Sequence, residues 1–80
     1  MVTLNKRWTL VASHGGSEWG LYAPKLTLRL RALIGFTGEK YSLKVWDETV
    51  QARWVSCGEF ESLSEAKSIG RVMAQMRIPA

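Results

Sequence analysis

Hydrophobic and polar residues alternate along most of the first sixty positions, which is the pattern of strands with one buried face. The clearest case is KLTLRLRAL, residues 25–33, where Leu26, Leu28 and Leu30 alternate with Thr27, Arg29 and Arg31. Helix is the alternative for this segment, because Leu, Arg and Ala all favour helices. On a helix, however, the leucines and arginines would occupy overlapping faces. Strands are therefore expected at residues 6–13, 19–23, 25–34, 40–47 and 50–57.

Short segments with turn residues separate these strands. Gly15 and Gly16 supply the positive φ values that a tight hairpin turn needs. Pro24 has no backbone N–H and predicts an edge or a bend. GFTGE, residues 35–39, and the acidic pair Asp47-Glu48 provide the next two turns.

The last part of the chain, residues 62–76, has the period of a helix. Ser62 followed by Glu65 is a capping box, in which each side chain can satisfy the other residue's backbone N–H. An apolar stripe follows at steps of three and four, formed by Ala66, Ile69, Gly70, Met73 and Met76. Glycine within a helix costs about 1 kcal/mol relative to alanine. Gly70 therefore either allows close approach of a bulky neighbour such as a tryptophan, or is a tolerated weak position.

These elements predict an α+β fold. Residues 1–80 form a single small domain, in which a meander of four to five antiparallel strands is packed on one face by a single C-terminal helix. The second face of the sheet is expected to stay uncovered.

The leucines of residues 25–33 set the predicted orientation of the sheet. If Leu26, Leu28 and Leu30 contact the helix, the residues between them point outward. The same alternation sends Trp8 and Trp54 into the core and Val11 and Val55 outward. The candidate binding residues on the uncovered face are Arg7, Arg29, Arg31, Lys44, Trp46 and Arg53.

Three interpretations of this face remain open. Arginine and lysine neutralise phosphates and tryptophan stacks on bases, so binding of nucleic acid, either DNA or RNA, is the leading hypothesis. Tryptophan and arginine are also enriched at protein–protein hot spots, so a larger protein partner is the alternative. A half-exposed sheet also carries basic residues for solubility alone.

Composition adds context. The chain has 80 residues, 46% of them hydrophobic, and Cys57 is its one cysteine, so no disulfide can form within it. The net charge of +4 is moderate. No apolar run approaches the roughly 20 residues of a membrane span, and the first residues lack a secretory signal. A cytoplasmic monomer or homodimer is expected.

Catalysis has no support in the sequence. His14 lies in a turn, and a nucleophile would need a base and an orienting group in reach. Glu59 near Cys57 disfavours a reactive thiolate. The glycines of HGGSEWG do not match a phosphate loop, and no residues suggest a metal site or cofactor. The sequence predicts a protein that is not an enzyme.

The closing half, from KYSLKVWD through GEFESLSEAKSIGRVM, is similar in style to small accessory proteins of bacteria and their phages. What carries this resemblance is a folding signal: a hairpin, a glycine, an aromatic residue, a serine cap and a helix. It names no single family and transfers no functional residues. It implies, as the alternative function, a compact inhibitor or adaptor that docks on a larger protein, such as an anti-defence protein.

Overall fold

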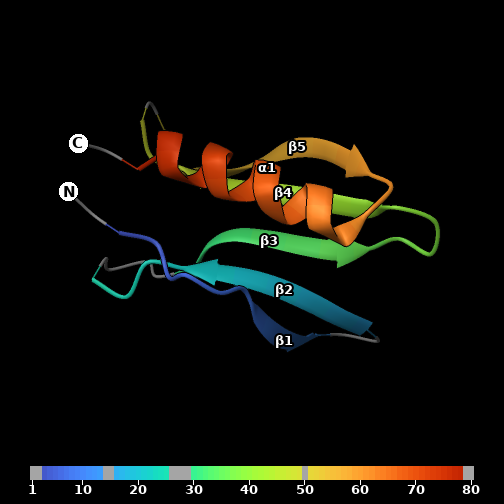
Figure 1. Ribbon diagram of the computed structural model, residues 1–80. Helices are drawn as coiled ribbons and strands as arrows, with labels where there is room; N and C mark the ends of the chain where they lie inside the picture. Colours follow the sequence, from blue (N-terminus) through green and yellow to red (C-terminus); the bar gives the residue numbers. More distant parts are fainter. Residues whose placement is uncertain (1–2, 14–15, 26–29, 50, 79–80) are drawn as a thin grey trace.

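Five antiparallel strands follow one another as a meander, and one helix lies against one side of the sheet (Figure 1). The computed structural model describes residues 3–13, 16–25, 30–49 and 51–78. The strands are β1 (Thr9–Ser13), β2 (Gly16–Tyr22), β3 (Leu30–Phe36), β4 (Tyr41–Asp47) and β5 (Arg53–Phe60), and the helix is α1 (Leu63–Met76). The predicted α+β meander with a single C-terminal helix is confirmed.

The strand bounds differ from those predicted at several ends. The first strand begins at Thr9 instead of residue 6, and the second begins at Gly16. In the third segment Lys25 lies in a turn and β3 begins only at Leu30. Residues 26–29, which carry most of the leucine alternation, lie outside the described residues. The fifth strand continues to Phe60.

The core lies between the sheet and α1, which contacts β3, β4 and β5. On the sheet, Ala32 faces Val45 and Ile34 faces Leu43 across the β3–β4 ladder. All four side chains are fully buried, together with Leu21, Ala66 and Ala74. Residues paired across a ladder share a face, so these two buried pairs show which side of the sheet meets the helix.

The helix begins where the sequence predicts. Ser62 is the N-cap in an extended conformation, and its hydroxyl accepts a hydrogen bond of 3.1 Å from the backbone N–H of Glu65. The predicted apolar stripe is only partly correct. Ala66 and Gly70 are buried and Met73 packs against the core, but Ile69 and Met76 are exposed. The buried line advances in steps of four through Gly70 to Ala74.

Gly70 is where the helix approaches Trp8. A Cβ on Gly70 would lie 2.8 Å from Cη2 of Trp8 and 2.9 Å from Cδ1 of Leu43. Neither distance leaves room for a methyl group, so the glycine allows the indole to pack directly on the helix backbone. This confirms the close approach to a tryptophan as the reason for a glycine here. Trp8 is half-buried against the core, as predicted.

Candidate binding face

The side of the sheet opposite α1 is here called the outer face. Cross-strand partners form three rows on it, because their neighbours along each strand point into the core. The middle row is Gly20, Leu33, Lys44 and Ser56, one flanking row is Glu18, Gly35, Ser42 and Glu59, and the other holds Trp46 and Trp54. These residues are the candidates for contact with a partner.

Trp46 and Trp54 form an aromatic pair at one end of the outer face. They are directly opposed on β4 and β5, and their rings meet edge to face with centroids 5.5 Å apart. The indole N–H of Trp46 donates a hydrogen bond of 2.7 Å to Oε1 of Glu48, which fixes the ring orientation. Trp54 is 38% exposed and Trp46 is half-buried. The pair therefore presents an apolar surface in which the hydrogen bond to Glu48 anchors the ring of Trp46.

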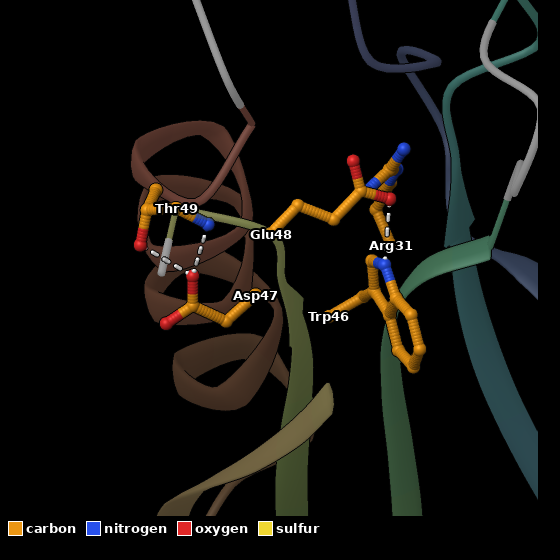
Figure 2. A network of polar contacts seen from close by, with 5 residues as sticks. All are labelled: Arg31, Trp46, Asp47, Glu48 and Thr49. Carbon is orange, nitrogen blue, oxygen red and sulfur yellow. Dashed lines mark hydrogen bonds and ion pairs between the residues drawn. The ribbon is translucent and has the colours of Figure 1, made fainter. Parts of the chain in front are cut away.

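Glu48 also holds Arg31, and together with Trp46 the three side chains form one network (Figure 2). Nη1 of Arg31 donates to the same Oε1 of Glu48 at 3.0 Å. Arg31 is only 1% exposed, and within the described residues its Nε has no hydrogen-bond partner. The prediction that Arg31 is a solvent-facing cation is wrong. Its charge is paired inside the protein, because a buried guanidinium requires an anionic partner.

A β-bulge explains why the alternation misplaces this segment. Leu21 pairs with Ala32 and Tyr22 pairs with Leu30, which leaves Arg31 without a cross-strand partner on β2. Leu30 was predicted to face the helix. Its Cδ1 instead lies 2.8 Å from the position of a Cβ on Gly20, which is on the outer face. The inward direction predicted for Leu30 is therefore wrong, although Ala32 and Ile34 keep the predicted phase.

The fifth strand has the opposite phase to the one predicted. Trp54 lies beside Trp46 on the outer face, so its assignment to the core is wrong. Val55 pairs with the buried Val45, and Arg53 pairs with Asp47, which places both on the helix side of the sheet. The outward placement of Arg53 and Val55 is thus also wrong.

The pairing of β5 with β4 sets this phase, and β5 contains a second bulge after it. The β4–β5 register shifts between Leu43 and Lys44, with Gly58 at a φ of 104°. The extra residue changes the parity of β5, so that Phe60 and Val55 share one side. A strict period of two would instead place Trp54 on the side of Phe60.

The remaining candidates have different positions. Lys44 is exposed and Trp46 half-buried, and both lie on the outer face as predicted. Arg7 is exposed in the segment before β1. Arg29 lies outside the described residues. Of the described members of the predicted set, Lys44 and Trp46 lie together on this face, and the buried Arg31 is linked to Trp46 through Glu48.

The described residues of the outer face are close to neutral in charge. Its rows contain one cation, Lys44, and two carboxylates, Glu18 and Glu59. The opposite charges of Arg31 and Glu48 cancel each other within their ion pair. A continuous basic surface, which the sequence predicts here, is not what these described residues form. Its rows instead combine polar side chains with Leu33 and the tryptophan pair.

Trp54 is the residue that sequence reasoning failed to place on this face. The missed signal is the pair Cys57-Gly58 within a strand, since glycine inside a strand pattern often marks a bulge. A bulge there separates the phase of Trp54 from that of Phe60. With Phe60 packed against the core, a bulge at this place puts Trp54 outward, beside Trp46.

Among the residues that the structure describes, two titratable groups have clearly shifted pKa values, for opposite physical reasons. Thr49 donates both its hydroxyl, at 2.6 Å, and its backbone N–H, at 2.8 Å, to Oδ1 of Asp47 (Figure 2). These hydrogen bonds, assisted by Arg77, lower the pKa of Asp47. Burial raises the pKa of the Cys57 thiol. A raised pKa keeps a thiol protonated, which agrees with the inert thiol expected there.

Comparisons with protein-family models, curated proteins and solved structures found no match for this chain. Among the residues that the structure describes, no three His, Cys, Asp or Glu side chains gather in a group suited to a metal ion. In the same part of the chain, no helix is long and apolar enough to cross a membrane.

Proposed function

We propose that this chain is a non-enzymatic binding protein that docks on a larger protein through its outer face. The observation that carries the proposal is the Trp46–Trp54 pair, which lies on a face whose charges nearly cancel. Tryptophan is the residue type most enriched at protein–protein hot spots, whereas a phosphate-binding surface needs an excess of cations. An inhibitor or adaptor of the kind found among phage and bacterial accessory proteins fits this surface.

Preorganisation supports the same proposal. The hydrogen bond from Trp46 to Glu48 and the edge-to-face contact with Trp54 hold the rings before any partner arrives. A partner therefore loses little side-chain entropy on ordering them. The lone thiol of Cys57 agrees with a reducing compartment, so we place this function in the cytoplasm.

The test is affinity capture of protein partners from a cytoplasmic extract of the source cells, with Trp54→Ala as the altered bait. The matched control is Leu10→Ala, which removes a side chain 62% exposed on β1, where its pairing with Trp19 places it on the helix side. We expect Trp54→Ala to weaken capture about tenfold or more, in the range of a hot-spot truncation. Equal capture by both variants, each with unchanged circular dichroism, would contradict the proposal.

Nucleic-acid binding is the second candidate function. It is favoured by the net charge of +4 and by the position of Lys44 next to the row that holds the exposed Trp54. A base could stack on the ring while the ammonium group contacts a phosphate. Because Lys44 is the one cation in the described rows of the outer face, about one phosphate contact is expected from it.

A titration against mixed DNA and RNA at two salt concentrations separates the two candidates. Binding through this face predicts a slope of log K against log[salt] of only about −1, and loss of affinity in Lys44→Ala. A steeper slope that is unchanged in Lys44→Ala would place nucleic acid elsewhere on the molecule. Absence of binding at low salt would remove this candidate.

A further inference from the structure

The start of the chain and the end of α1 enclose a groove on the side of the molecule that carries the helix. It has a volume of about 440 Å³ and is lined by Thr3, Leu4, Arg71, Val72, Gln75 and Met76. Leu4 is buried, while Val72 and Met76 are 58% and 63% exposed. Two large apolar side chains one helical turn apart are therefore presented to solvent beside a buried leucine.

The charges that line this groove are positive. Arg71 lies in its wall, and an adjoining hollow of about 250 Å³, which shares Thr3 and Leu4, is lined by Lys6 and Lys25. Among the described lining residues of both hollows there is no Asp or Glu. The apolar surface is thus bordered by three cations.

Arg71 is held in a fixed position. Its Nη1 donates to the carbonyl of Asn5 at 2.8 Å and its Nη2 donates to the carbonyl of Lys6 at 2.6 Å. These contacts use two of the five N–H groups of the guanidinium, and no carboxylate among the described lining residues neutralises its charge. A preorganised guanidinium beside an apolar surface is suited to a carboxylate that lies next to an apolar side chain.

We propose that this groove binds an acidic peptide segment of a partner protein. An apolar side chain of the segment packs between Leu4, Val72 and Met76, and its carboxylates lie against Arg71, Lys6 and Lys25. Methionine adapts to differently shaped apolar groups, so several segments of this chemistry can fit. The site is on the opposite side of the sheet from Trp46 and Trp54, and it does not depend on the function proposed for the outer face.

A library of random 12-residue displayed peptides tests the proposal, with the full chain as bait. The altered bait is Val72→Glu, which places a carboxylate in the groove at a solvent-exposed helix position. The matched control is Ile69→Glu, a change of the same kind on the same helix at a residue outside the lining. Helical circular dichroism of both variants verifies that each is folded.

We expect the unaltered chain and Ile69→Glu to select peptides rich in Asp or Glu with a bulky apolar residue. Val72→Glu should bind those peptides at least tenfold more weakly, and raising the salt concentration should weaken all binding. Amide shifts on adding a selected peptide should centre on residues 3–6 and 71–76. The proposal is overturned if no peptide is selected, if those selected are neutral or basic, or if Val72→Glu binds as well as Ile69→Glu.

The other possible occupant of the groove is a second copy of the chain, and sedimentation measures such self-association. Self-association that is lost in Val72→Glu would overturn the proposal, because the groove would then be a homomeric interface. Trp54→Ala leaves this groove unaltered and should still bind the selected peptides. The two proposals can therefore fail separately: Trp54→Ala tests capture of a protein partner by the outer face, and Val72→Glu tests peptide binding by the groove.

Discussion

Removal of Glu48 should destabilise this protein more than removal of Arg31, the residue that Glu48 pairs with. Arg31 is 1% exposed and the Glu48 carboxylate lies 3.0 Å from it, whereas Glu48 itself is 31% exposed. In Glu48→Ala the guanidinium stays buried without this partner, and the indole N–H of Trp46 also loses its acceptor. In Arg31→Met the carboxylate keeps Trp46 and contact with water, and a methionine fills much of the vacated apolar volume.

The burial of the two groups sets the expected magnitudes. Loss of one partner from a fully buried ion pair costs roughly 3–5 kcal/mol. Because Glu48 is partly exposed, we expect about 2–3 kcal/mol for Glu48→Ala and about 1 kcal/mol for Arg31→Met. The double variant should resemble Arg31→Met, since the cost of the unpaired charge disappears with the charge itself. The two changes would then be strongly non-additive.

Urea unfolding followed by far-ultraviolet circular dichroism measures these differences without dependence on tryptophan emission. With a slope of about 1 kcal/mol per molar urea, the midpoint of Glu48→Ala should fall by about 2–3 M. Glu59→Ala is the control, an exposed carboxylate on the outer face that should change stability by no more than about 0.5 kcal/mol. A cost for Glu48→Ala equal to that control, or smaller than for Arg31→Met, would refute a structural role for the pair.

Two further predictions test the packing and the protonation of the core. Gly70→Ala gains about 1 kcal/mol of helix propensity but overpacks against Trp8 at a cost of about 1–3 kcal/mol, so we expect net destabilisation near 1 kcal/mol in the same unfolding assay. The same substitution in a Trp8→Leu chain should cost less, because the contact with Trp8 is removed while the 2.9 Å approach to Cδ1 of Leu43 remains. A gain of stability in the unaltered chain would contradict the close contact. Burial raises the pKa of Cys57, so the pH at which iodoacetamide reacts at half its maximal rate should lie higher in the folded chain than the ordinary value of about 8.5. Because the unfolded thiol ionises first, stability should also fall as the pH rises above that value, and a native midpoint at or below it would contradict this prediction.

Local signals in the sequence were sufficient for the elements and their order. Alternation with a period of two indicates the strands, and Ser62 with Glu65 marks the start of the helix, whereas the predicted turn residues Gly16, Gly35 and Asp47 lie within β2, β3 and β4. Each of these depends on neighbours within about four residues, so no knowledge of distant contacts is needed. The position of Gly70 on the apolar side of the helix indicated a close neighbour as one of two possibilities, and the contact with Trp8 decided between them.

The orientation of β5 and the state of Arg31 depend on tertiary structure. Pairing with β4 places Trp54 on the outer face and Arg53 on the other side, and one extra residue at the β5 bulge reverses the parity between Trp54 and Phe60. The position of such a bulge is set by pairing with a strand that lies elsewhere in the sequence.

The same holds for the charges. Arg31 and Glu48 are 17 residues apart, and only the folded sheet brings them within 3.0 Å. The sequence by itself determined that this chain forms a meander under one helix, because periodicity is a local property. Only the tertiary structure decided that the described part of its open face carries a tryptophan pair and nearly balanced charges, because register and ion pairing are formed between distant segments.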